Sequence, residues 1–234
     1  MSAIFKREVK SYFSSPLGYI YLSVFYLIAG FFFYTYNVQE HTTDMRTLYS
    51  YLYNFGIFLI PLLTMRLMSE DKKQKTDQAL LTAPISLFEL VFGKYLSALM
   101  LYFMGTVITL IYAFFMSFFS PVDWPVIVGC FIGLNLAGAS LIAVGMFIST
   151  LTESQMIAAV LSLVVMLFLS VYDTIAKLVG IPFIKAALLK ASFVQNFATY
   201  SIGVVNLGST VFFLSIIGLF IFLTIRVIDK RRWA

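Results

Sequence analysis

The sequence predicts an all-α integral membrane protein with six transmembrane helices. Hydrophobic residues make up 61% of the 234 residues and charged residues only 12%, and the mean hydropathy is +0.93. Soluble domains carry about 25% charged residues, so a soluble fold is excluded. The apolar residues fall into about six long runs separated by polar segments. A helix needs about 20 such residues to cross a bilayer.

The first 15 residues predict a helix that lies along the membrane surface. One helical face is apolar and consists of Ile4, Phe5, Val9, Tyr12 and Phe13. The other face carries most of the charges, Lys6, Arg7, Glu8 and Lys10. An amphipathic helix of this kind lies in the interface and does not cross it. No small-residue cleavage site precedes the first long run, so a cleavable signal peptide is not expected.

Two spans follow. Leu17 to Tyr36 is uncharged and predicts the first span, and the polar residues 37–47 predict a loop. Leu48 to Met68 predicts the second span. It contains Pro61, which frees a backbone carbonyl group and tends to kink a helix.

Residues 70–86 form a dense island of charge and predict a short helix outside the membrane, followed by a turn. Its acids and bases, residues 70–77, are expected to stay in water, whereas Leu80, Leu81 and Ile85 recur at helical spacing and form an apolar side. Pro84 disfavours the helical conformation at Ala83, which predicts the turn. Such a helix is a docking surface; the alternative is a solvated loop whose charges serve solubility.

The next two runs predict spans three and four. Residues 87–119 exceed the thickness of a bilayer, so the first turns, with Glu89 and Lys94, are expected in the interface. A tight turn with Trp124 follows. The fourth span, residues 126–148, repeats Gly129, Gly133 and Ala137 at a spacing that lets another helix approach closely.

The last part predicts two more spans and an irregular segment between them. Residues 156–177 form the fifth span, with Asp173 and Lys177 one turn apart as an expected ion pair. Residues 178–207 are only moderately apolar and predict short helices or re-entrant segments on the extracellular face. Residues 208–225 form the sixth span.

The basic residues predict the orientation. One side of the membrane carries Lys6, Arg7, Lys10, Arg66, Lys72, Lys73, Lys75, Lys94, Arg226, Lys230, Arg231 and Arg232. The other side carries only Arg46, Lys177, Lys185 and Lys190. By the positive-inside rule both termini and the charged island are cytoplasmic, and the chain is a multi-pass protein of the cytoplasmic membrane.

The sequence lacks the residues that several functions require. Cys130 and His41 have no neighbouring ligands, so neither a metal site nor a catalytic triad is expected. Gly93-Lys94 lacks the upstream glycine of a phosphate-binding loop, so an enzyme and a bound cofactor are not expected in this chain. The bases flank apolar runs and do not form one face, which argues against a nucleic-acid partner.

The spans are also poor in ionisable groups, which disfavours an ion-coupled carrier or channel. Asn135 is the most conspicuous polar side chain near a span centre, and an interhelical hydrogen bond is its simplest role. A membrane protein without its own energy source, but with a structured protrusion into the cytosol, suggests that an external motor drives it.

Three stretches carry a family resemblance. The first contains Met65-Arg66, Glu70-Asp71-Lys72, Thr76, Leu80-Leu81-Thr82, Pro84-Ile85-Ser86 and Gly93-Lys94-Tyr95-Leu96. The others are Glu8 to Tyr19, with Tyr12-Phe13-Ser14-Ser15-Pro16, and Ser149 to Ala159, with Leu151-Thr152 and Gln155. Together they resemble the ABC-2 type transporter permeases, particularly the branch of the gliding-motility-associated and nitrous-oxide-reductase-maturation permeases.

The resemblance implies one membrane domain over residues 1–234, with a type V exporter-like fold. Residues 1–15 would be a connecting helix, and residues 70–86 a coupling helix that seats in a separate ATPase subunit. The implied contacts are Glu70, Asp71, Lys72, Lys73, Thr76, Leu80, Leu81, Thr82, Pro84 and Ser86, with a second cytosolic loop of Thr152, Glu153, Ser154 and Gln155. Lys75, Asp77 and Gln78 stand where the family has glycine, leucine and glutamate.

The resemblance also implies partners. Two permease chains, identical or related, would face each other with the first and fifth spans near the axis, surrounded by membrane lipids, and ATP and Mg would bind to the ATPase. Phe25, Phe31, Phe32 and Asn135 would line a path for an apolar or amphipathic substrate, with core packing as the alternative for the rings. A different function, a membrane scaffold or anchor for a motility or maturation assembly, fits the same charged island.

Overall fold

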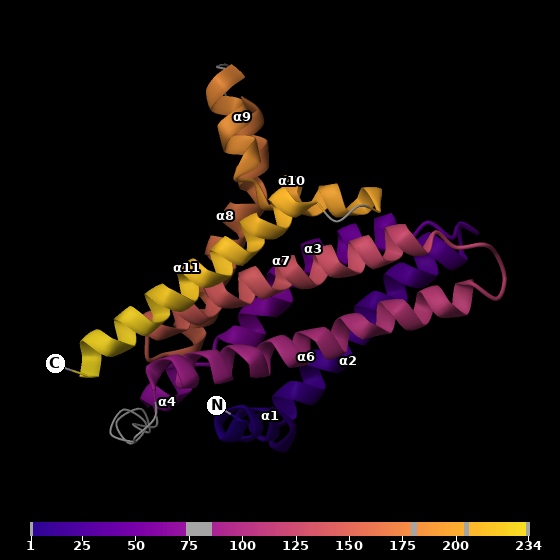
Figure 1. The fold of residues 1–234 in the computed structure, drawn as a ribbon. Coiled ribbons are helices and arrows are strands. Elements are labelled where there is room, and N and C mark those ends of the chain that lie inside the picture. Colours follow the sequence, from indigo (N-terminus) through magenta and orange to yellow (C-terminus); the bar gives the residue numbers. More distant parts are fainter. Residues whose placement is uncertain (1, 74–85, 179–181, 204–205, 233–234) are drawn as a thin grey trace.

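The fold is a bundle of six long helices, and it confirms the predicted class (Figure 1). A computed structural model describes residues 2–73, 86–178, 182–203 and 206–232. The six helices long and apolar enough to cross a membrane cover Pro16–Val38, Arg46–Lys73, Leu87–Met116, Trp124–Leu151, Gln155–Leu178 and Leu207–Lys230. The chain is therefore a multi-pass membrane protein.

The long helices are α2 (Pro16–Phe33), α3 (Arg46–Thr64), α6 (Leu87–Met116), α7 (Trp124–Leu151), α8 (Gln155–Leu178) and α11 (Leu207–Arg232). The shorter elements are α1 (Ser2–Ser14), the π-helix η1 (Tyr34–Val38), α4 (Ser69–Lys73), α9 (Pro182–Lys190), α10 (Phe193–Ala198) and the 3-10 helix η2 (Thr199–Ile202). The last three are short helices between the fifth and sixth spans. Within the described residues no strand occurs.

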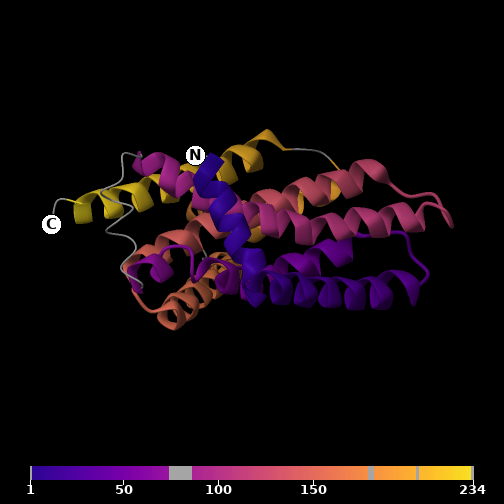
Figure 2. The same ribbon diagram turned by 90° about the horizontal axis from the view of Figure 1, so that it is seen from below.

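The elements divide between two ends of the bundle. Helix α1, α4, the turn between α7 and α8 and the end of α11 lie at one end, and α1 runs across the bundle and not along it (Figures 1 and 2). The α2–α3 loop, the α6–α7 turn, α9 and α10 lie toward the other end. This separation matches the predicted topology. Which end faces the cytoplasm stays a prediction.

Two predicted spans have different ends in the structure. The first continues past Tyr36 as the π-helix η1, which reaches Val38. The second runs through Pro61 but its regular helix ends at Thr64 and not at Met68. A turn at residues 65–68 then redirects the chain into α4. The predicted third span is one continuous helix of 30 residues, as its length in the sequence indicated.

Helix α7 is the centre of the bundle, because α3, α6, α8 and α11 all pack against it. In its most apolar window 67% of the residues are buried, against 17% for α8. Cys130 of α7 is fully buried and free, as expected of a packing residue.

The glycines of α7 allow this close packing. The predicted stripe of Gly129 and Gly133 is covered by Tyr200 of η2, and not by another long helix. A Cβ atom on Gly133 would lie 2.7 Å from Cβ of Tyr200. One on Gly145 would lie 2.3 Å from Oγ1 of Thr64 and 2.9 Å from its Cβ. Thr64 is itself fully buried, so the side chain has no room to move away.

Replacement of Gly145 by alanine should therefore destabilise the bundle. We expect a loss of about 1 to 3 kcal/mol, the usual cost of overpacking, measured as the free energy of unfolding in mixed detergent micelles. The matched control is Gly218→Ala in α11, where nothing lies within 4 Å of the added Cβ. Because alanine favours a helix more than glycine, the control should be neutral or slightly more stable. Equal stability of the two variants would contradict the packing described here.

Candidate functional site

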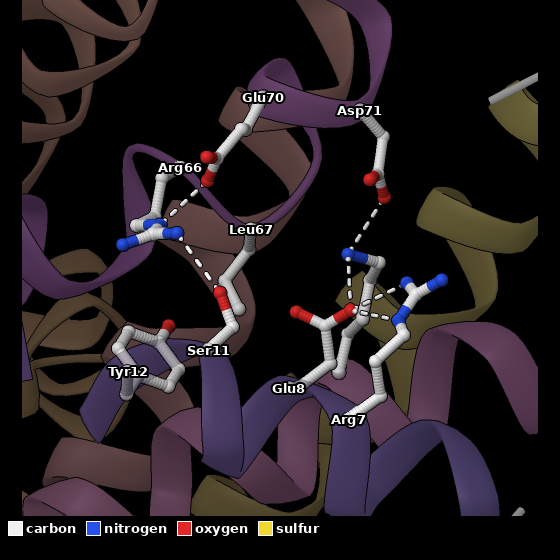
Figure 3. A pocket seen from close by; sticks show the side chains of 9 residues that line it. Arg7, Glu8, Ser11, Tyr12, Arg66, Leu67, Glu70 and Asp71 are labelled. Atoms are coloured by element: carbon white, nitrogen blue, oxygen red, sulfur yellow. Dashed lines mark hydrogen bonds and ion pairs between the residues drawn. The ribbon is translucent and has the colours of Figure 1, made fainter. Parts of the chain in front are cut away.

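A cluster of charged and polar side chains joins three elements at the α1 end of the bundle (Figure 3). It lines a cavity of about 220 Å³ and comes from α1, the α3–α4 junction and the start of α6. We call it the basal cluster, and its members are Arg7, Glu8, Ser11, Tyr12, Arg66, Leu67, Glu70, Asp71 and Lys94. It lies at the base of the charged segment, because α4 leads into residues 74–85 and α6 follows them.

Lys94 links all three elements. Its side chain is only 3% exposed, and its Nζ lies 3.1 Å from Oε1 of Glu8 in α1 and 2.7 Å from Oδ2 of Asp71 in α4. A buried ammonium group is stable only when it is paired, so the two carboxylates are required where they are. Gly93 lets α1 come close enough, since a Cβ there would lie 3.1 Å from Cγ2 of Ile4.

Arg66 makes the second set of links. Its Nε lies 2.6 Å from Oε2 of Glu70. Its two terminal nitrogens donate to Oγ of Ser15 at 2.9 Å and to Oγ of Ser11 at 3.1 Å. The planar guanidinium group can make all three bonds at once. It therefore holds the start of α4 against α1 independently of Lys94.

Tyr12 lies under Arg66 and completes the contact between α1 and α3. The Arg66 guanidinium carbon is 5.6 Å from the centre of the ring, a cation–π distance. The hydroxyl group donates to the carbonyl oxygen of Leu63 at 3.2 Å. Burial raises the pKa of Tyr12 above its ordinary value, so the hydroxyl group remains a neutral donor.

Ser149 of α7 holds the junction between α3 and α4. Its Oγ accepts from the backbone N–H groups of Met68 and Ser69, both at 3.1 Å, and donates to the carbonyl oxygen of Met65 at 3.0 Å. One hydroxyl group thus satisfies three backbone groups where the helix is interrupted. Next to it, Nζ of Lys72 donates to the carbonyl oxygen of Thr150.

The two predicted cytosolic segments consequently lie side by side. Helix α4 contacts both α7 and α8, and the turn between those helices consists of Thr152, Glu153 and Ser154, with Gln155 as the first residue of α8. Oγ1 of Thr152 accepts from the N–H of Ser154 at 3.1 Å and stabilises the turn.

The structure describes only part of the predicted coupling helix. Glu70, Asp71, Lys72 and Lys73 lie in α4, and Ser86 caps α6 by accepting from the N–H of Glu89 at 3.2 Å. The remaining predicted contacts, Thr76, Leu80, Leu81, Thr82 and Pro84, lie outside the described residues. The expectation that the acids of this stretch stay in water is wrong for Asp71, because the buried Lys94 draws it into the basal cluster.

The sequence did not identify Glu8, Ser11, Arg66 and Ser149 as site residues. Signals for some of them were present. Arg66 and Glu70 have the spacing of a helical ion pair, and Lys94 is a charge within a long apolar run, where ionisable residues tend to have a partner and a role. The pairing of Lys94 with Glu8, 86 positions away, had no local signal.

The four residues assigned to a path do not share one surface in this structure. Phe25 is 2% exposed and lies between Tyr102 and Gly105 in the core. Phe32 stacks on Tyr51 of α3 with ring centres 4.9 Å apart. Phe31 is exposed. The assignment of a path stays a prediction.

Asn135 has its expected interhelical bond, since its Oδ1 accepts from Thr106 Oγ1 of α6 at 3.1 Å.

At the far end of α8, Asp173 and Lys177 form the expected ion pair. Asp173 also accepts from Ser192 Oγ at 3.0 Å, which attaches α10 to α8. Among the described residues, no three His, Cys, Asp or Glu side chains are grouped as a metal site requires.

Comparison with known proteins gives one family. The model of the ABC-2 type transporter family matches residues 1–176, which include the whole basal cluster and the α7–α8 turn. The match does not extend to a branch of the family, so the resemblance to one branch stays a prediction. A search of curated proteins finds no match.

Replacement of Lys94 by methionine should destabilise the protein by about 2 kcal/mol or more, because it removes the buried cation that the partly buried carboxylates of Glu8 and Asp71 share. The same replacement combined with Glu8→Gln and Asp71→Asn also removes the negative charges that Lys94 balanced and should recover part of this loss. Unfolding in mixed detergent micelles measures both. Lys230→Gln, at an exposed lysine of α11, is the control and should behave as the unmodified protein. If the variant with Lys94→Met alone were as stable as this control, the buried ion pairs would be refuted.

Replacement of Ser149 by alanine should cost about 1 to 3 kcal/mol, because buried backbone groups lose their partner. The matched control is Ser140→Ala on the same helix. Ser140 is equally buried, but its hydroxyl group bonds only to Ala137 within α7. Hydrogen exchange at residues 65–73 should rise in the Ser149 variant alone, and equal exchange in both variants would show that Ser149 does not hold the junction.

Proposed function

The chain belongs to the ABC-2 type transporter family, and we propose that it is the transmembrane permease subunit of an exporter driven by a separate ATPase subunit. Residues 70–86 would dock on that ATPase, and the turn of Thr152, Glu153 and Ser154 would form a second contact. ATP and Mg would bind to the ATPase.

The observation that supports this proposal most strongly is the basal cluster. A segment that only solvates the protein needs no rigid attachment. Here both ends of the charged segment are attached, α4 through Asp71 and Arg66, and α6 through Lys94. The same groups bind α1. A displacement of the segment would therefore move three elements together.

In the proposed transport mechanism the helices of the permease move as rigid bodies. Closure of the ATPase would push the docked segment, and the basal cluster would transmit this push to α1, α3 and α6. Packed helices respond by moving as units, because cores and interfaces do not deform continuously. Ser149 would extend the displacement to α7, the centre of the bundle.

A second permease chain would complete the transporter. Helix α8 is the least buried of the six long helices, with 17% of its window inside the chain. Most of its outward side chains are apolar, and they include Val160, Val164 and Phe168. This face supports the proposed pairing through the fifth span. A substrate path would then lie between the two chains.

Co-purification in mild detergent tests the docking assignment. Charge reversal at Lys72 and Lys73 combined with Leu80→Asp should remove the ATPase and abolish the stimulation of ATP hydrolysis by the permease. The control is charge reversal at Lys185 and Lys190, at the other end of the bundle, which should leave both intact. Undiminished binding and stimulation in the first variant would refute the assignment.

Reconstituted vesicles separate an exporter from a scaffold. An exporter stimulates ATP hydrolysis and moves substrate only when ATP is present, whereas a scaffold retains the partner without movement. A current or proton flux without ATP would indicate an ion-coupled carrier. We expect ATP-dependent movement alone.

A further inference from the structure

An open groove runs along the membrane-facing side of α6 and α7 and ends at α1. Its volume is about 530 Å³, within the range of about 300–1,000 Å³ typical of ligand pockets. One wall is Leu96, Leu99, Met100 and Phe103 of α6, and the other is Phe131, Ile132, Asn135, Leu136 and Ala139 of α7. Phe5 of α1 closes the foot. We call it the α6–α7 groove.

The sequence builds the groove from two matched helical stripes. Residues 96, 99, 100 and 103 of α6 and residues 132, 135, 136 and 139 of α7 both follow the i, i+3, i+4, i+7 pattern, so each set occupies one helical face. The wall side chains Met100 and Phe103 are 39% and 47% exposed. Among the described residues no further helix lines this surface, although it lies between two candidate membrane-spanning helices.

The groove presents almost no free polar group. Asn135 is its one amide side chain, and both ends of the amide are bonded within the protein: Nδ2 donates to the carbonyl oxygen of Phe131 at 2.9 Å, and Oδ1 accepts from Thr106. An occupant must therefore be apolar along its length. At the deep end the rings of Phe103 and Phe131 meet edge to face, with centres 5.8 Å apart.

The length of the α6–α7 groove suits an acyl chain of a lipid. The wall from Leu96 to Phe103 spans about 10 Å at 1.5 Å per helical residue. One leaflet contributes about 15 Å to the hydrocarbon core. The groove thus begins at the level of the interfacial helix and covers most of one leaflet, as an acyl chain does.

The helix at the foot of the groove carries exposed bases. Lys6 and Lys10 are exposed on α1, the helix that supplies Phe5 to the groove. The neighbouring acid, Glu8, is already paired with Lys94 and Arg7. Exposed lysines on an interfacial helix attract anionic lipid headgroups. Charge and apolar shape together select one kind of ligand.

We propose that the α6–α7 groove binds an anionic phospholipid of the leaflet in which α1 lies, with one acyl chain between α6 and α7 and the phosphate group beside Lys6 and Lys10. The lipid fills the space under α1 and attaches that helix to α6 and α7 from the membrane side, opposite the basal cluster. It is a bound component of the fold and not the transported substrate. The proposal therefore does not depend on the ATPase.

Native mass spectrometry of the purified permease alone, with added phosphatidylglycerol or phosphatidylcholine, tests the site. We expect phosphatidylglycerol to be retained about tenfold more tightly, consistent with two lysines near the headgroup. The double variant Lys6→Gln, Lys10→Gln should lose this preference but still bind both lipids through the acyl chain. Lys185→Gln with Lys190→Gln is the control and should keep the preference. A preference that survives the first pair, or is absent from the unmodified protein, overturns the headgroup assignment.

The variant Met100→Trp tests whether an acyl chain occupies the groove. The indole would enter the groove and should reduce retention of both lipids about tenfold, whereas Ile111→Trp, at an exposed position of the same helix outside the groove, should not. If Met100→Trp does not fold, competition in the unmodified protein decides: phosphatidylglycerol with full-length chains should displace bound lipid, and soluble glycerol phosphate should not.

Two results would contradict the placement of an acyl chain in the α6–α7 groove. One is equal lipid retention in the two tryptophan variants. The other is loss of a permease dimer in Met100→Trp alone, which would show that a second copy covers the groove. Neither result concerns the ATPase. A failure of the lipid proposal would therefore leave the proposed permease function unaffected.

Discussion

The structure depends on the compensation of one buried cation. Lys94 lies in a helix that is otherwise apolar, and its ammonium group is stable there only because Glu8 and Asp71 reach it from two other elements. Removal of either partner would leave charge in a poorly solvated position. The requirement fixes where α1 crosses the bundle and where α4 leaves it. Together with the bonds of Arg66 and Ser149, this constraint sets the geometry of the α1 end.

The bundle combines a rigid centre with a less enclosed periphery. Helix α7 is held by glycine contacts at Gly133 and Gly145 and by the bonds of Ser149, whereas α8 is buried over only a small part of its surface. Displacement of a tightly packed centre carries its neighbours along, and a weakly packed outer helix can change partner at little cost. This division suits the proposed subunit, which would be moved at one end and paired with another chain along its side.

Much of the fold could be predicted from the sequence, because a bilayer requires runs of about 20 apolar residues and these are visible without a structure. The surface helix was visible from its amphipathic pattern, and the pair of Asp173 and Lys177 from its spacing. The basal cluster was not, because its pairs join positions up to 86 residues apart and charge alone does not name a partner. The stripe of Gly129 and Gly133 predicted a close approach to α7, but a small residue does not identify the approaching side chain as Tyr200.

In the proposed mechanism the basal cluster transmits movement from residues 70–86 to α1. Spin labels at Lys10 of α1 and Lys230 of α11, in the complex with its ATPase, would measure this directly by double electron–electron resonance. ATP trapping should change the distance between the labels in the unmodified permease. In the variant with Glu8→Gln and Lys94→Met, which leaves residues 70–86 unchanged, the change should decrease. An identical ATP-dependent change in both proteins would contradict the account.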